Sequence, residues 1–201
     1  KKIALEINKN FLEVILAKGF DKDSLEILKR KKNLRIIDIS NFKIRNLTTL
    51  KSFDGSFLIQ NKDNIVFDKK KLRCVTKLKP SKKEIAEMQF AFNICKHVKS
   101  NAIVLCNNFS TIGIGAGQPS RLDSCKIEVQ KAKNFQSSKI KNSIAASDAF
   151  FPFTDGIYAL IKAGVKTIIQ PGGSIRDQEV INVANKAKIK MLFTGVRHFN
   201  H

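Results

Sequence analysis

Acidic residues are scarce in this sequence of 201 residues, in which 17 Asp and Glu stand against 37 Lys and Arg and give a formal charge of +20. Such an excess of positive charge points to an anionic partner, either nucleic acid or a phosphorylated metabolite. The lysines are scattered through every segment and form no long basic block. We therefore interpret the charge as a solvated surface that helps to attract small anions, and we do not expect a nucleic-acid partner. A basic nucleic-acid-binding α/β module is the alternative hypothesis.

Paired cysteines are also lacking. The four cysteines form no CxxC pair and have no spacing typical of a zinc site. We expect them to be reduced core residues of a cytosolic protein: Cys74, Cys95, Cys106 and Cys125. No neighbouring residue marks any of them as a catalytic thiol.

Long apolar runs are missing as well. No stretch approaches the roughly 20 apolar residues that span a bilayer, and no signal peptide is visible. We therefore expect a soluble, cytoplasmic protein with no membrane partner. Apolar residues still make up 43% of the sequence, which suffices for the core of one sizeable domain or two small lobes. The sequence begins at Lys1 and starts directly in an amphipathic pattern, so we expect a fragment of a longer protein.

Residues 1–80 predict a less regular connecting region. Apolar residues from 3 to 17 recur near helical spacing and predict a helix that ends before Gly19. A second helix is expected from about Asp23. The other elements expected here are a strand at 34–39, a turn at Asp54–Gly55 and short strands at 57–59 and 65–67.

Residues 81–201 predict a regular alternation of strands and helices. Ser81 and Glu84 have the capping-box spacing, which predicts a helix that runs to about His97. Further helices are expected at 120–133, 155–163 and 177–187, and strands at 102–106, 111–117, up to about 149, at 167–170 and at 191–194. This alternation implies an α/β fold, a sheet domain layered αβα.

Four polar loops lie at the ends of these predicted strands. They span residues 100–101, 115–121, 148–155 and 171–177. Ligands of α/β proteins bind in loops at strand ends, so the coincidence of four such loops predicts a ligand site.

Several features inside or near these loops have two interpretations. The glycines of Gly113–Gly117 suit a phosphate loop or a tight turn that lets two backbones approach, and they lack the full GxGxxG and GK[ST] patterns. Arg121, near a helix start, suits an anion site or a structural salt bridge. The aromatic rings of Phe150–Phe153 suit the core or stacking on a planar ligand.

Three further features are equally open. Pro171–Ile175 is either a ligand-lining loop or a turn. Lys96–His97 resembles a general base with an electrostatic helper, but at a helix end such a pair more often complements the helix dipole. His198 and His201 have no evident third ligand and do not predict a metal site.

Five motifs in the second half of the sequence occur in the same order in the AICAR transformylase domains of the PurH family. They are KSNAI at 99–103, GIGAGQPSR at 113–121, SDAFFPF at 147–153, QPGGSIRD at 170–177 and TGVRHFNH at 194–201. Residues 11–17 and 25–35 also resemble the family, and residues 40–75 match it least. The sequence thus resembles the C-terminal part of that domain over nearly its whole length.

The resemblance implies formyl transfer from 10-formyltetrahydrofolate to 5-aminoimidazole-4-carboxamide ribonucleotide (AICAR) in the synthesis of inosine monophosphate (IMP). It implies a cytidine-deaminase-like lobe at 81–201, 10-formyltetrahydrofolate as co-substrate, no metal required for catalysis, and a homodimer of the intact protein. It places AICAR at Asn101, Arg121, Phe150 and Arg197, and the folate at Leu122, Asp155, Ser174 and Ile175.

One departure from the family pattern concerns catalysis. The catalytic Lys-His pair of the family lies in an upstream KHxNPxG-like segment, which the 201 residues lack, as they lack the N-terminal IMP cyclohydrolase domain. Lys96–His97 belongs to a different segment and does not inherit that role. We therefore expect no catalytic residue in this sequence, which represents a binding half of an active site and is inactive alone.

Overall fold

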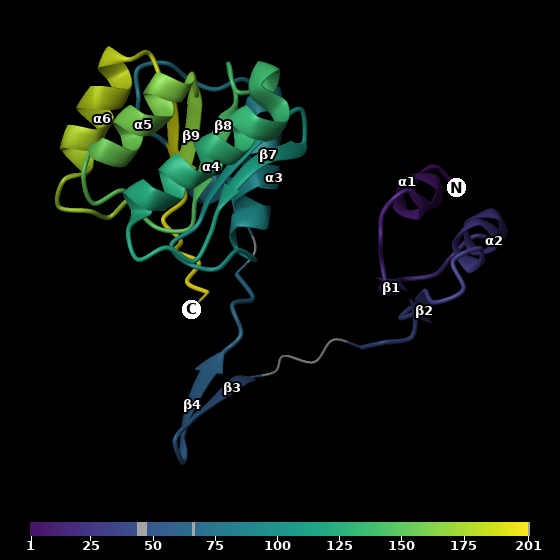
Figure 1. Cartoon of the computed structure of the whole chain (residues 1–201). Coiled ribbons are helices and arrows are strands. Elements are labelled where there is room, and N and C mark those ends of the chain that lie inside the picture. The colour runs from purple at the N-terminus through teal and green to yellow at the C-terminus, as the bar shows by residue number, and fades with distance from the viewer. Residues whose placement is uncertain (44–47, 66, 201) are drawn as a thin grey trace. The chain divides into compact units, whose positions relative to one another are not determined.

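The computed structural model describes residues 1–43, 48–65 and 67–200. It divides the chain into two compact units, Lys1–Lys62 and Asp63–His201, which are described separately below (Figure 1). None of the helices in these described residues is long and apolar enough to cross a membrane.

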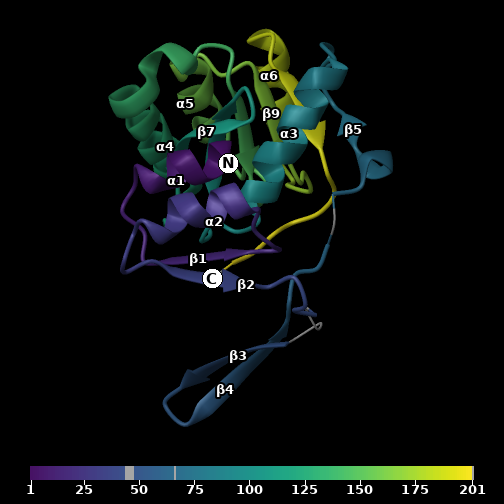
Figure 2. The same ribbon diagram turned by 90° about the vertical axis from the view of Figure 1, so that its right-hand side faces the viewer.

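The first unit consists of short elements around a small core. Its elements are α1 (Lys2–Asn8), β1 (Val14–Ala17), α2 (Lys22–Lys29), β2 (Arg35–Asp38), β3 (Thr48–Phe53) and β4 (Ser56–Asn61). Strands β1 and β2 pair in parallel, and α1 and α2 lie beside each other (Figure 2). The buried apolar residues are Ala4, Ile27 and Leu28, against which Ile15 and Ile36 pack from the two strands.

The prediction of a single helix over residues 3–17 is wrong. The helix ends at Asn8, and residues 14–17 form β1. Val14 and Ile15 are β-branched and favour a strand. Their pairing with β2 comes from residues some 20 positions away, which a local helical spacing does not reveal. The other N-terminal helix begins where predicted, because the Asp21 side chain accepts a hydrogen bond from the Ser24 N–H at 2.6 Å.

Strands β3 and β4 form an antiparallel hairpin around Asp54–Gly55. Both turn residues have positive φ angles, 38° and 80°, as two-residue hairpin turns of type I′ require. The predicted turn and the strand at 57–59 are confirmed. Of the strand predicted at 65–67, Val66 lies outside the described residues, and Ile65 and Phe67 belong to no strand.

The second unit is built on one mixed sheet of six strands in the order β5-β10-β9-β8-β6-β7. Its strands are β5 (Arg73–Cys74), β6 (Ile103–Asn107), β7 (Ser110–Gly115), β8 (Ile144–Ser147), β9 (Thr167–Gln170) and β10 (Lys190–Phe193). Its helices are α3 (Lys82–Cys95), α4 (Arg121–Gln136), α5 (Asp155–Ala163) and α6 (Asp177–Lys186), with 3-10 turns η1 (Lys69–Lys71) and η2 (Ser137–Lys139). Each strand and helix predicted after residue 81 is present, shifted by a few residues at most.

Alternate residues of the strands divide the core into two layers. Ile103 and Leu105 of β6 face one layer together with apolar residues of α4, α5 and α6. Val104 and Cys106 face the other, which α3 covers. The sheet therefore lies between helices on both faces, as the layered α/β prediction requires (Figure 1). The capping box of α3 is also confirmed, with both Ser81–Glu84 hydrogen bonds formed.

Three of the four cysteines are core residues and one is not. Cys95, Cys106 and Cys125 are buried free thiols, and burial raises the pKa of Cys106 to about 12. Cys74 is exposed, which contradicts the expectation that all four fill the core. It lies on β5, a two-residue strand at the edge of the sheet, where one side faces solvent.

Candidate ligand-binding site

The topology brings all the polar loops to one edge of the sheet. Strands β8, β9 and β10 are parallel, so their carboxyl ends share an edge. Strand β6 runs antiparallel to β8 and therefore begins at that edge. Strand β7 runs antiparallel to β6 and therefore ends there. The loops before β6 and after β7, β8, β9 and β10 consequently meet, although they are spread over a hundred residues of sequence.

A cavity of about 470 Å³ opens at this edge. Two segments and two single residues line it: Pro119–Leu122, Ala149–Phe153 with Asp155 and Gly156, Asn101 and Phe199. Its walls are mostly apolar and aromatic, with a few polar groups from Asn101, Ser120, Arg121 and Asp155. A volume of this size and such a lining are typical of small-molecule sites.

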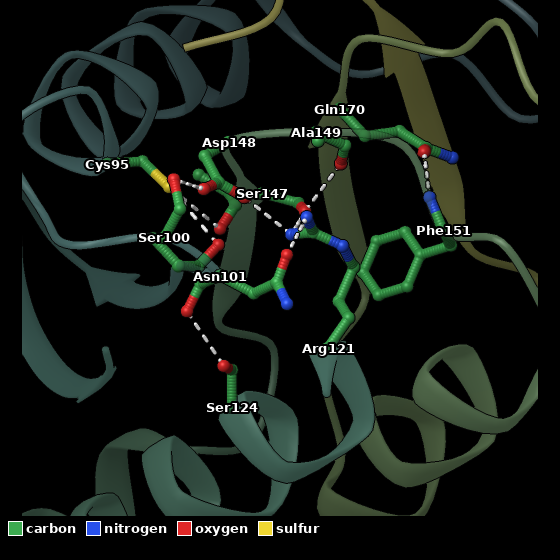
Figure 3. Close-up of polar contacts among 12 residues, drawn as sticks. Cys95, Ser100, Asn101, Arg121, Ser124, Ser147, Asp148, Ala149, Phe151 and Gln170 are labelled. Atoms are coloured by element: carbon green, nitrogen blue, oxygen red, sulfur yellow. Dashed lines mark hydrogen bonds and ion pairs between the residues drawn. The ribbon is translucent and has the colours of Figure 1, made fainter. Parts of the chain in front are cut away.

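Arg121 supplies the buried charge of the site. Its guanidinium forms an ion pair with Asp148 and donates further hydrogen bonds to Ser147 Oγ and Asn101 Oδ1, both at 2.8 Å (Figure 3). The side chains of Arg121 and Asp148 are 7% and 0% exposed. Arg121 therefore forms a structural salt bridge, as one of its two sequence interpretations predicts. Of its five N–H groups, three donate in these contacts and two have no partner among the described residues.

Asn101 is held just as firmly. Its amide nitrogen donates to the carbonyl oxygens of Gln118 and Pro119, at 2.9 and 3.0 Å. Its Oδ1 accepts from Arg121 and keeps one lone pair. The pair of Arg121 and Asn101 thus presents a small number of fixed hydrogen-bonding positions rather than a free positive charge.

Asp148 connects this pair to the C-terminal tail. Its second carboxylate oxygen accepts from Ser100 Oγ at 2.6 Å, and its backbone oxygen accepts from the His198 N–H at 2.9 Å. The Ser100 N–H in turn donates to the Asn200 carbonyl oxygen at 2.9 Å, and Ser100 Oγ accepts from the Asn200 N–H at 3.0 Å. The tail is therefore fixed against the start of β6, which explains why Phe199 lines the cavity.

The glycines of the Gly113–Gly117 motif have a packing role. A Cβ on Gly113 or Gly115 would overlap backbone oxygens of α4, those of Glu128 and Ser124 respectively. Both glycines therefore allow helix α4 to lie directly on β7. None of the motif's glycines lines the cavity, so the structure favours the close-approach interpretation over the phosphate loop.

The predicted site residues fall into two groups. Asn101, Arg121, Leu122, Phe150 and Asp155 line the cavity together. Three others lie outside its lining: Arg197, Ser174 and Ile175. Arg197 stacks on the Phe199 ring at 5.4 Å, and Arg176, beside Ile175, stacks on Phe153 at 5.0 Å. The C-terminal segment and the loop after β9 thus each contact an aromatic residue of the cavity wall without lining the cavity at these positions.

Lys96, His97 and His198 lie away from the cavity. Lys96 forms an ion pair with Asp63 at 3.4 Å. Asp63 also contacts Nδ1 of the buried His198. His97 is exposed at the end of α3. No group of three potential metal ligands occurs among residues 1–43, 48–65 and 67–200. His201 lies outside the described residues.

The sequence interpretation missed residues that support the site from behind. Ser147, Asp148 and Gln170 are buried polar residues at the ends of β8 and β9 that hold the lining residues in place. Polar residues that directly follow an apolar strand are the sequence signal that could have identified them. Phe199 also lines the cavity, although the sequence analysis contains it only within the motif at 194–201 and assigns it no role.

The fold and the cavity define an α/β protein with a mixed six-stranded sheet and a cavity of small-molecule size at the sheet edge. The family model described as "AICARFT/IMPCHase bienzyme" matches residues 1–131. The chain is 48% identical over 207 aligned residues to the bifunctional purine biosynthesis protein PurH of Bartonella bacilliformis, covering 98% of the chain and 38% of that protein. It is 45% identical over 198 residues to the PurH protein of Aquifex aeolicus, with the same two coverages.

The chain therefore belongs to the AICARFT/IMPCHase bienzyme family. It spans 38% of the length of these curated relatives. Among solved structures, RibD of Acinetobacter baumannii is similar over 53% of this chain and 35% of its own, at 15% identity and a TM-score of 0.41, which is too distant to support an argument.

Proposed function

We propose that this chain is the C-terminal part of an AICAR transformylase domain and binds AICAR and 10-formyltetrahydrofolate at the cavity of the sheet edge. The observation that carries the proposal is the meeting of Asn101, Arg121, Leu122, Phe150 and Asp155 around one cavity in a member of this family. The convergence of loops also favours a ligand site over the nucleic-acid-binding alternative, which needs a basic face instead.

The roles proposed for the lining residues follow from their chemistry. The fixed N–H groups of Arg121 and the free lone pair of Asn101 suit the polar edge of a carboxamide-bearing ring. The half-buried Phe150 offers a flat apolar face for stacking. Arg197, exposed beside Phe199, approaches the anionic part of the nucleotide from the rim. Leu122 and Asp155 contact the folate, which Ser174 and Ile175 reach from the neighbouring loop.

The proposed reaction forms a bond between the AICAR amine nitrogen and the formyl carbon and breaks the bond from that carbon to N10 of the folate. The amine proton leaves with the help of a base and is transferred to the departing tetrahydrofolate. Positive charge near the developing oxyanion lowers the barrier. We assign both tasks to the Lys-His pair of the upstream family segment, so the 201 residues provide binding and not the acid–base step.

The proposal extends to the organisation of the intact protein. Residues 81–201 form a cytidine-deaminase-like lobe and residues 1–80 connect it to the remainder of the domain. The intact protein also carries the IMP cyclohydrolase activity, uses no metal in formyl transfer, forms a homodimer and acts in the cytoplasm. The family description, which names both AICARFT and IMPCHase, and the word "bifunctional" in the names of the relatives support the pairing of the two activities.

Isothermal titration calorimetry of the 201-residue chain with AICAR tests the binding role. We expect saturable binding that Phe150→Ala weakens at least about fivefold, since stacking of a base on an aromatic ring contributes about 1–3 kcal/mol. Phe135→Ala, which removes an exposed ring at the end of α4, is the matched control and leaves the affinity unchanged. Tetrahydrofolate release by the same chain is expected to be undetectable.

Two results would contradict the proposal. AICAR binding that is equal in wild type and Phe150→Ala places the ligand elsewhere. Turnover by the 201-residue chain at the rate of an intact relative shows that the acid–base groups lie within these residues.

A further inference from the structure

Gln170 is a buried polar residue behind the cavity wall. It is the last residue of β9, and its side chain is fully buried. Its Oε1 accepts a hydrogen bond from the backbone N–H of Phe151 at 2.9 Å (Figure 3). Its Nε2 lies 3.4 Å from the sulfur of Met191 on the neighbouring strand β10. The carboxamide thus bridges the sheet and the segment that follows β8.

That segment, Ala149–Phe153, supplies much of the cavity lining but belongs to no strand or helix. Its position therefore depends on individual contacts. Ser147 Oγ donates to the Ala149 carbonyl oxygen at 2.6 Å. The Phe151 ring is 1% exposed and packs on Gly156, where an added Cβ would lie only 3.0 Å from it. Phe150 lies between these anchored residues.

We propose that Gln170 is a positioning residue that sets the place of Phe150 in the cavity by accepting the hydrogen bond of the Phe151 N–H. The expected effect of Gln170 on AICAR affinity rests on the proposed function. The effect of Gln170 on the position of the Phe151 segment does not. A buried N–H without an acceptor is costly, so the segment must move to find water or another partner when Oε1 is removed. Phe150, one residue away, moves with it.

Two substitutions distinguish this role from simple packing. Gln170→Met preserves the length and unbranched shape but removes the acceptor. Gln170→Glu preserves an oxygen at the same position, and at pH 5.5 burial keeps such a carboxyl neutral. If Gln170 only fills space, the Met variant keeps its AICAR affinity and the Glu variant loses affinity. If Gln170 positions the segment, the Met variant loses AICAR affinity and the Glu variant keeps it.

The experiment combines AICAR titration with amide hydrogen exchange of the unliganded 201-residue chain, both at pH 5.5. We expect Gln170→Met to bind AICAR at least about tenfold more weakly and Gln170→Glu within about threefold of wild type. We expect the Phe151 amide to exchange at least about tenfold faster in the Met variant and to stay protected in the Glu variant. Thermal unfolding of both variants separates affinity from stability.

The exchange measurement keeps the two proposals apart. If wild type does not bind AICAR, the proposed function fails, while the Phe151 amide still reports on Gln170. The positioning role is overturned if the Met variant retains wild-type affinity, or if its Phe151 amide stays protected. It is also overturned if the Glu variant loses as much as the Met variant. If the Met variant does not fold, the remaining two proteins still test the positioning role. Rapid exchange of the Phe151 amide in wild type or in Gln170→Glu then overturns that role.

Discussion

Both units of the chain contain apolar strands, but these strands reach different degrees of burial. In the second unit, Ile103, Val104 and Leu105 are consecutive strand residues and all are fully buried, because helices cover both faces of the six-stranded sheet. In the first unit, Phe11 is 87% and Phe57 66% exposed, and each sheet has only two strands. The spacing of apolar residues favours a particular helix or strand, but a strand is buried only when other elements cover both faces of its sheet.

The difference has an energetic consequence. The two-stranded hairpin of β3 and β4, exposed almost throughout, is marginally stable in water, and parallel strands such as β1 and β2 are normally buried on both faces. The outward residues Val14, Leu16 and Ile37 of β1 and β2 remain exposed in the described structure. We therefore expect the measurable stability of the chain to come from residues 63–201, and the substitutions below compare the two units on that basis.

The largest expected loss of stability comes from breaking the buried ion pair of the second unit. Asp148→Ala leaves the buried Arg121 guanidinium without its counter-charge, which costs about 3–5 kcal/mol of unfolding free energy. Asp23→Ala removes the exposed pair with Lys1 in the first unit and should leave the main urea transition unchanged, because solvent screens that pair. Far-UV circular dichroism during urea titration measures both. A similar loss in the two variants would mean that the units do not differ as described.

A smaller effect is expected from glycine substitutions. Gly115→Ala places a methyl group against the Ser124 backbone and forces α4 away from β7, at a cost of about 3 kcal/mol. Gly55→Ala in the hairpin turn meets no atom within 4 Å, so its cost is the strain of its φ of 80°, about 1 kcal/mol, confined to the first unit. The same urea titration compares them. Equal midpoints for Gly115→Ala and wild type would show that the close packing of α4 on β7 is not maintained in solution.

The smallest effect is a gain in stability that depends on pH. Burial raises the pKa of Glu128 well above its ordinary value of 4.5, and neither carboxyl oxygen has a hydrogen-bond partner. The folded state therefore keeps the proton that the unfolded state loses above that value, so stability falls as the pH rises through and beyond 4.5. Glu128→Met removes this loss and should raise the melting temperature at pH 7.5 by about 3 °C or more.

The matched control is Glu87→Met on α3. Glu87 is also buried, but it accepts a hydrogen bond from the Phe109 N–H at 3.2 Å. Its replacement should not stabilise the protein, because it leaves that N–H without its acceptor. Calorimetric melting at pH 4 and 7.5 compares the variants. A gain for Glu128→Met that is the same at both pH values would contradict the neutral state assigned to Glu128.

Much of the second unit was predictable from the sequence because local signals agree there. The Ser81–Glu84 capping box, the spacing of apolar residues in α5 and the short apolar run of β9 each identify an element without distant partners. The error over residues 3–17 arose because the pairing of β1 with β2 overrides the local helical spacing. Likewise, the exposure of Cys74 depends on its place in an edge strand.

The family, the αβα layering and the polar loops could all be predicted from the sequence, because motifs, apolar periodicity and turn residues are local properties of the chain. The neutralisation of Arg121 by Asp148 and the packing role of the glycines of 113–117 became visible in the folded structure. That structure alone placed Arg197, Ser174 and Ile175 outside the cavity lining and Gln170 behind it. Hydrogen bonds and close contacts join residues that are far apart in the chain, and their partners emerge only when the strands are ordered in the sheet.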